Sequence, residues 1–130
     1  MKKLITERFA INGLFLILTL FVLFHLLILF GIVPYERVWG GRLKNQAQMR
    51  SFETVSIIIN LIMLATVAIK AGFLKVRLPQ MIIKIVFWAM FVLFFFNTIG
   101  NVLSINAFEK IVFTPITLLL ALFSLRTAIA

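Results

Sequence analysis

Cysteine and aspartate are absent from the sequence. The chain has one histidine, and its only acidic residues are four glutamates. Without cysteine, the chain cannot form disulfides, use a thiolate nucleophile or hold an iron–sulfur cluster. Without aspartate, it cannot build a Ser–His–Asp triad. One histidine and four scattered carboxylates are too few for an ordinary zinc or two-metal centre within one chain. We therefore predict no metal site and no catalytic residues of these classes.

Glycine-rich nucleotide-binding loops are also missing. No Walker or dinucleotide-binding pattern occurs, and Gly40-Gly41 alone does not make one. The sequence thus predicts no cofactor and favours a function other than catalysis. An enzymatic interpretation would require a membrane-embedded enzyme acting on lipid, with Glu53 and His25 as the two candidates for its general base.

The net charge is +9, which in a water-soluble protein would suggest nucleic-acid binding. Here the 13 basic residues lie between long apolar segments or near their ends. Basic residues in such positions orient a membrane protein and attract anionic lipid headgroups. We expect the partner of these residues to be the lipid bilayer with its anionic lipids, and we expect no nucleic acid.

Apolar residues are abundant, at 63% of the chain, with 15 phenylalanines among them. A typical soluble domain has about 45–50%. A small domain buries only part of its chain's surface, so this apolar excess cannot all be hidden from water. The composition therefore predicts that much of the surface contacts lipid.

Four segments are long enough to supply the roughly 20 apolar residues that cross a bilayer as a helix. They cover about 9–33, 52–71, 81–105 and 107–130. The polar stretch 44–50 before the second segment is also compatible with helix. The sequence predicts an all-α integral membrane protein, a four-helix antiparallel transmembrane bundle that forms a single domain over residues 1–130.

Pro115 lies inside the fourth segment. Proline has no backbone N–H, and its ring conflicts with the carbonyl four residues earlier, here that of Ile111. We therefore predict a bend in the fourth helix near Pro115.

Basic residues are distributed unequally between the two sides of such a bundle. One side holds eight of them, and the other side holds five: Lys2, Lys3, Arg8, Lys70, Lys75, Arg77, Lys84 and Arg126 against Arg37, Arg42, Lys44, Arg50 and Lys110. The positive-inside rule places the richer side in the cytoplasm. We expect a multi-pass protein of the bacterial inner (plasma) membrane with both termini cytoplasmic.

Polar side chains within the apolar segments are the candidates for function, because polar groups in lipid are costly and usually face the bundle interior. His25, Asn60 and Asn97 each lie about eight residues from the predicted outer end of their helix, or about 12 Å below the surface. Glu53 and Asn101 lie nearer that end. We predict that these five residues line a ligand-binding cavity that opens at the outer side and is closed by apolar packing below.

Simpler interpretations exist for the same residues. Asn, Ser and Thr in membrane helices commonly form hydrogen bonds between helices. Glu53 could pair with Arg50 at the membrane interface, and one asparagine could satisfy His25. Two functional hypotheses follow: a small transporter, channel or ligand-binding protein, alone or as a homo-oligomer, and an accessory or structural subunit of a larger membrane complex.

Overall fold

A computed structural model describes residues 5–32, 45–104 and 107–130. The fold is an all-α bundle of four long helices, as the sequence predicted. They are α1 (Glu7–Leu29), α2 (Gln46–Ala71), α3 (Gln80–Val102) and α4 (Thr114–Ala128), and a short π-helix, η3 (Glu109–Phe113), leads directly into α4. Each of four helical segments is long and apolar enough to cross a membrane, consistent with a multi-pass membrane protein.

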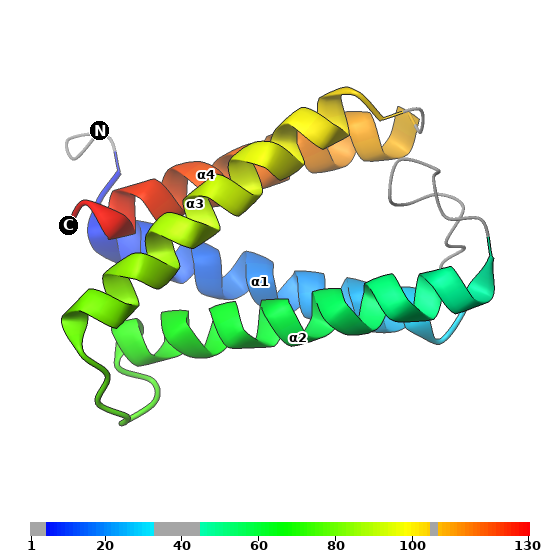
Figure 1. The fold of residues 1–130 in the computed structure, drawn as a ribbon. Coiled ribbons are helices and arrows are strands. Elements are labelled where there is room, and N and C mark those ends of the chain that lie inside the picture. The colour runs from blue at the N-terminus through cyan, green and yellow to red at the C-terminus, as the bar shows by residue number, and fades with distance from the viewer. Residues whose placement is uncertain (1–4, 33–44, 105–106) are drawn as a thin grey trace.

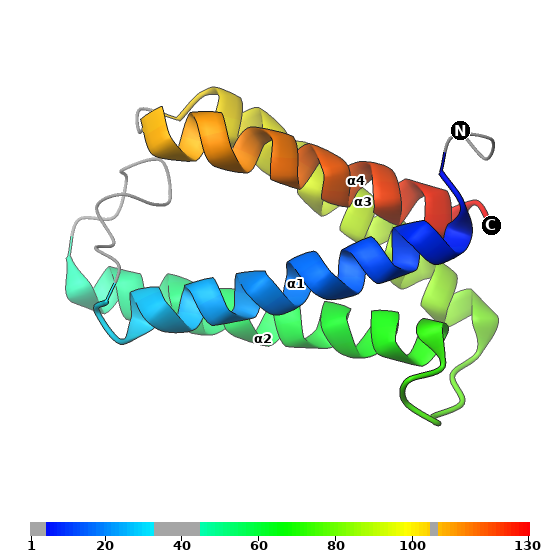
Figure 2. The ribbon, with the colours of Figure 1, turned by 180° about the vertical axis from the view of Figure 1, so that it is seen from behind.

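The helices form two hairpins, α1 with α2 and α3 with α4 (Figure 1). The hairpins meet mainly through α1 and α4, whereas α2 and α3 contact each other much less. Both views show the hairpins close together at the end that holds the termini and apart at the other end (Figures 1 and 2). We call the half with the termini the terminal half, and the half that contains residues 21–29, 46–60, 95–102 and 107–117 the open half.

Side-chain caps fix where α1 and α2 begin. Thr6 Oγ1 accepts a hydrogen bond from Phe9 N at 3.1 Å, and Asn45 Oδ1 accepts one from Gln48 N at 2.8 Å. Such caps satisfy backbone donors that have no partner within the helix. The cap at Asn45 starts α2 six residues before the predicted position 52, so the polar stretch that precedes the apolar segment is helical from Gln46.

A glycine ends α1 earlier than predicted. Gly31 has a φ of +82°, a left-handed conformation that glycine adopts without steric cost. Gly31 N donates to Ile28 O at 3.0 Å, and Ile32 N donates to Leu27 O at 2.9 Å. This is the Schellman pattern of helix ends. It stops α1 at Leu29, four residues before the predicted end at position 33.

A bend was predicted near Pro115, and the structure has a π-helical turn directly before it. Residues 109–113 are π-helical, and Pro115 lies in the first turn of α4. A wider turn avoids the proline's missing donor and the clash of its ring. The hydroxyl of Thr117 donates to Phe113 O at 2.8 Å and so occupies a carbonyl at the end of the π-helix.

The apolar core fills the terminal half of the bundle. Leu14, Leu18, Val67 and Leu120 have no exposed surface, and they come from three of the helices. The remaining members include residues of α3: Ala10, Ile11, Met63, Ile83, Phe87, Met90, Phe94, Ala121, Phe123 and Ala128. In contrast, large apolar side chains are exposed on the outer surface of all four helices, as is expected of helices in contact with lipid.

Candidate functional site

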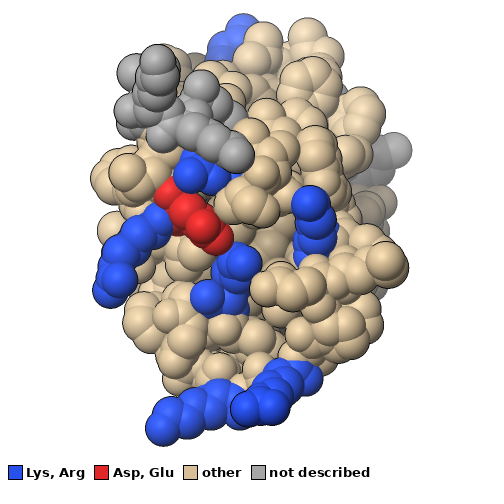
Figure 3. Space-filling view, turned by 90° about the vertical axis from the view of Figure 1, so that its left-hand side faces the viewer, with Lys and Arg blue, Asp and Glu red and all other residues tan. Residues whose placement is uncertain are grey.

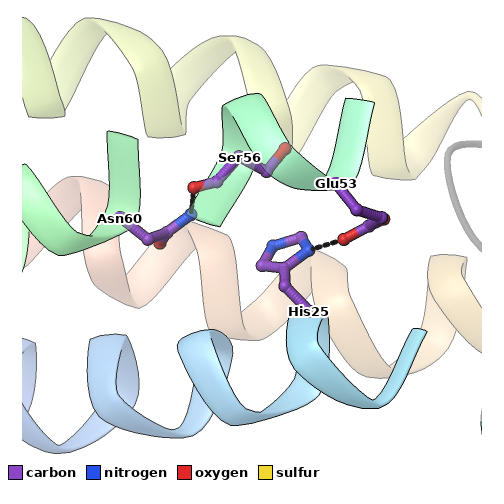
Figure 4. Close-up of polar contacts among 4 residues, drawn as sticks. All are labelled: His25, Glu53, Ser56 and Asn60. Carbon is purple, nitrogen blue, oxygen red and sulfur yellow. Dashed lines mark hydrogen bonds and ion pairs between the residues drawn. The ribbon is translucent and has the colours of Figure 1, made fainter. Parts of the chain in front are cut away.

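A buried histidine–glutamate pair joins α1 to α2 in the open half. His25 Nδ1 lies 2.5 Å from Glu53 Oε2 (Figure 4). The Glu53 side chain has no exposed surface, and the His25 side chain is 17% exposed. A glutamate is almost never fully buried unless it is paired, because an isolated carboxylate loses its hydration without compensation. The contact with the histidine therefore offsets part of the cost of burying this carboxyl group.

The arrangement of hydrogens on the imidazole depends on the charge state of the pair. When Glu53 is ionised, its carboxylate only accepts hydrogen bonds, and Nδ1 then carries the hydrogen that it donates to Glu53. The other ring nitrogen, Nε2, is turned toward the side of Ser56 and Asn60 (Figure 4). In the neutral ring Nε2 is an acceptor, and in the imidazolium it is a donor. The donor or acceptor character of this position thus changes with one proton.

Aromatic rings surround the histidine. Its ring centroid lies 6.4 Å from that of Phe21 and 6.1 Å from that of Phe24. Both phenylalanines also contact Phe113, which belongs to η3. These rings keep the local dielectric constant low, and electrostatic interactions in such surroundings are stronger than in water.

A cavity of about 400 Å³ lies next to the pair and receives side chains from all four helices. This volume is within the range of small-molecule sites, about 300–1,000 Å³. All five residues proposed as ligand-binding from the sequence line it: His25, Glu53, Asn60, Asn97 and Asn101. The remaining lining residues are mostly apolar: Phe21, Phe24, Ile28, Phe52, Val55, Ser56, Ile59, Met63, Leu93, Phe94, Phe96, Gly100, Phe113 and Thr117.

The depths expected for His25 and Glu53 were wrong. His25 was expected level with Asn60, and Glu53 nearer the mouth. Instead His25 pairs with Glu53, and Asn60 lies seven residues, about 10 Å, further along α2. The error came from counting depth from the predicted helix ends, which lie six residues too late on α2 and four too late on α1. Glu53 pairs with His25, and Arg50, the partner considered from the sequence, is exposed.

Asn60 adds a buried acceptor to the cavity wall. Its Nδ2 donates to Ser56 O at 2.7 Å (Figure 4). A backbone carbonyl can only accept, so this contact fixes which end of the amide is the oxygen. Asn60 Oδ1 is buried and has no hydrogen-bond partner among the described residues. A buried acceptor without a hydrogen bond destabilises the protein. A ligand that donates a hydrogen bond to Asn60 Oδ1 would remove this cost.

The asparagines of α3 lie on the opposite wall and differ from each other. Asn101 is buried, and its Nδ2 donates to Thr117 Oγ1 at 3.2 Å. Thr98 Oγ1 lies 3.0 Å from the same hydroxyl oxygen, so these contacts bind α3 to α4. Asn97 is exposed and lines the cavity. Asn101 therefore helps to hold the hairpin together, as the helix-packing interpretation allowed, whereas Asn97 lies open to a ligand.

Most of the basic residues that the structure describes lie away from this cavity. The described residues that line it include no lysine or arginine. The end of the terminal half, by contrast, carries Arg8, Lys70, Lys75, Arg77, Lys84 and Arg126. Figure 3 faces this end and shows the basic side chains spread around one acidic patch. Glu7 is 3.6 Å from Lys70 there, and buried Arg126 donates from Nε to Ile5 O at 2.8 Å.

Sequence reasoning missed the aromatic wall of the site and the hydroxyl of Ser56. Phe21 and Phe24 are two among 15 phenylalanines, and nothing in their spacing separates lipid-facing rings from lining ones. Ser56 shares one stripe of α2 with Glu53 and Asn60, which was a usable signal. Within the described residues, no group of three His or Glu side chains could hold a metal ion.

The role of this site is inferred from its geometry alone, because comparison with known proteins gives no match. No protein-family model, no curated protein and no solved structure matches this chain.

Proposed function

We propose that this protein binds a small molecule in the cavity beside the His25–Glu53 pair and serves as a small membrane transporter or ligand-binding protein. The observation that carries the proposal is the convergence of polar side chains from separate helices on one cavity of about 400 Å³. A cavity with a mostly apolar wall and a few polar groups is the usual form of a small-molecule site.

The burial of the His25–Glu53 pair supports the same conclusion. Burying two ionisable groups rarely stabilises a protein more than apolar residues of similar volume would. Ionisable groups within membrane helices commonly mark ligand or proton pathways. The pair lines a cavity instead of lying in the apolar core, so its position favours a ligand over a purely structural purpose.

The alternative role, a subunit of a larger membrane complex, is less well supported. That hypothesis requires polar stripes that point outward at a partner. The five candidate residues instead line a common cavity, and four of them are buried or half-buried.

The orientation in the membrane belongs to the same proposal. The basic end of the terminal half would face the cytoplasm and its anionic lipids, because cytoplasmic ends of membrane helices are rich in lysine and arginine. The open half and its cavity would then lie toward the opposite side of the membrane.

A ligand screen with a blocked cavity tests the binding function. Fluorinated fragments are screened by ¹⁹F NMR against the protein in lipid nanodiscs. Ser56→Phe places a ring inside the cavity, and Ile62→Phe places the same ring on the exposed face of α2. We expect fragments that bind the parent protein and Ile62→Phe to lose binding to Ser56→Phe. If no fragment discriminates between the two variants, the cavity is not a binding site.

A further inference from the structure

The cavity beside the His25–Glu53 pair opens between α2 and α3. Its exposed apolar lining residues all come from these two helices: Phe52, Val55, Ile59, Leu93 and Phe96. The lining residues from α1, η3 and α4 are buried or half-buried. Figures 1 and 2 agree that α2 and α3 stand apart in this half. The mouth of the cavity is therefore the opening between these two helices.

In a bilayer this mouth would face the hydrocarbon. Both α2 and α3 have the length and apolar composition of membrane-crossing helices, and the rim residues belong to these spans. Phe96, on the rim, is 62% exposed. Ile59, on the facing rim, lies about 20 Å along α2 from its start at Gln46, far from the end of the helix. A molecule that passes between these side chains comes from the membrane, and its apolar part has apolar partners on both sides.

The cavity wall contains a hydrogen-bond acceptor that is not used by the protein. Three buried side-chain polar atoms have no hydrogen-bond partner among the described residues: Asn60 Oδ1, Thr114 Oγ1 and Arg126 Nη1. Of these residues, Asn60 lines the cavity, and it is 7% exposed. Its Nδ2 is held by Ser56 O at 2.7 Å, which leaves the oxygen as the group that a ligand can reach. A hydrogen-bond donor in the cavity therefore has an acceptor in a fixed position.

The composition of the wall favours an uncharged donor. The described lining residues include no lysine or arginine that would pair with a phosphate or carboxylate head. A charged group that leaves water for an apolar site loses far more free energy than a hydroxyl does, and one hydrogen bond compensates the hydroxyl. Within hydrocarbon, a hydroxyl finds no acceptor other than one supplied by protein. Asn60 Oδ1 therefore attracts an uncharged O–H group out of the surrounding lipid.

We propose that the ligand is an uncharged amphiphile, a hydroxyl head on an apolar chain, which enters from the bilayer between α2 and α3 and donates a hydrogen bond to Asn60 Oδ1. This inference rests on the proposed binding function. The chain of the ligand leaves the cavity between Ile59 and Phe96 and continues into the hydrocarbon. The cavity of about 400 Å³ has room for the head and several carbons, since one water takes only about 30 Å³.

Two isomeric amphiphiles test the donor. The probes are octanol and heptyl methyl ether, which have the same atoms, but only octanol has an O–H group. Both are added to the protein in phosphatidylcholine nanodiscs and compared at equal mole fraction in the bilayer. The chain has one histidine, and this residue lines the cavity. The ring resonances of ¹⁵N-histidine therefore report occupancy of the cavity, provided that the affinity tag contains no histidine.

We expect octanol to bind about tenfold more tightly than the ether, because the ether leaves Asn60 Oδ1 buried without a donor. Asn60→Leu, which removes the acceptor and retains a side chain of similar size, should abolish this preference. Asn12→Leu removes an exposed asparagine of α1 outside the cavity and should leave the preference unchanged.

A longer alcohol tests the route of entry. Hexadecanol carries the same head on a chain of twice the length. If the chain extends through the mouth into lipid, hexadecanol should bind within about threefold of octanol at equal mole fraction, because the extra carbons stay in hydrocarbon in both states. A cavity that is closed toward the bilayer would exclude the longer alcohol and admit only octanol.

Each result has a distinct meaning. If the ether binds the parent protein as tightly as octanol, or if the preference persists in Asn60→Leu, the hydrogen bond to Asn60 is wrong. If octanol binds and hexadecanol does not, entry from the bilayer is wrong. If no probe changes the histidine resonances while the fragment screen is positive, the amphiphile is wrong and the binding function stands. If both experiments are negative, the binding function itself is wrong. The comparison of the isomers in the parent protein does not depend on whether Asn60→Leu folds.

Discussion

Energetic coupling between His25 and Glu53 follows from their burial and can be measured with two apolar substitutions. His25→Phe retains a ring among the neighbouring phenylalanines, and Glu53→Met retains an unbranched side chain of similar length. We expect a coupling energy of about 1.5–3 kcal/mol, the usual contribution of a hydrogen bond to a charged group. Hydrogen bonds between membrane helices average about 0.6 kcal/mol.

The two single substitutions should differ in effect. Glu53 has no exposed surface, whereas the His25 side chain is 17% exposed. His25→Phe should therefore be the more destabilising, because it removes a partner from a fully buried carboxylate. The double variant should be more stable than His25→Phe alone, since two apolar residues leave no charge to compensate.

Reversible unfolding in mixed SDS micelles, followed by far-UV circular dichroism, gives the free energies for this cycle. A matched cycle at Thr98 and Thr117, whose hydroxyl oxygens are 3.0 Å apart between α3 and α4, provides the reference for an ordinary interhelical contact. That cycle should give about 0.6 kcal/mol. If the His25 and Glu53 effects add to within about 0.5 kcal/mol, the two residues are not coupled and the reasoning is refuted.

Three further predictions concern packing and orientation. Gly13→Ala should lower the free energy of unfolding in SDS by about 1–3 kcal/mol, since its Cβ would lie 2.6 Å from the ring of buried Phe123. Gly100→Ala, whose Cβ meets nothing within 4 Å, should leave that free energy unchanged or raise it by up to about 1 kcal/mol. Equal effects of the two substitutions would contradict the packing. Arg126→Leu should destabilise the protein by about 1.5–3 kcal/mol, because it removes the hydrogen bond from Arg126 Nε to Ile5 O, just before α1. Unchanged hydrogen exchange in the first turn of α1 would argue that this hydrogen bond does not hold the start of α1 in place. A reporter fused after Ala130 should be active in a cytoplasmic assay, and activity on the other side would reverse the proposed orientation.

The fold was predictable because length and hydropathy dominate helix formation in membranes. Each apolar segment became a helix, and the last one begins with a π-helical turn just before Pro115, where a bend was predicted. The ends of α1 and α2 were less predictable, because local hydrogen bonds at Gly31 and Asn45 set them and the apolar composition does not report these bonds. Helix count therefore followed from composition, whereas helix register depended on individual capping residues.

Five polar residues that line the cavity were predictable from the sequence, but their contacts were not. Polar residues in apolar helices turn toward the interior, so His25, Glu53, Asn60, Asn97 and Asn101 could be identified from their surroundings in the sequence. Their pairing required the relative register of α1 and α2, which errors of four and six residues at the helix ends concealed. The opening between α2 and α3 depends on how the two hairpins diverge, and no local pattern in the sequence specifies that angle.

The distance between His25 and Glu53 in a lipid bilayer tests the central claim most directly. Protein labelled with ¹⁵N at the histidine ring and with ¹³C at the glutamate carboxyl groups is measured by solid-state dipolar recoupling. The Nδ1 to Oε2 distance of 2.5 Å and a C–O bond of about 1.23 Å place the carboxyl carbon no more than about 3.7 Å from Nδ1. We predict strong dephasing that disappears in Glu53→Gln protein labelled in the same way. Absence of dephasing in the parent protein would show that the His25–Glu53 pair does not form. The proposed binding site beside this pair would then be wrong.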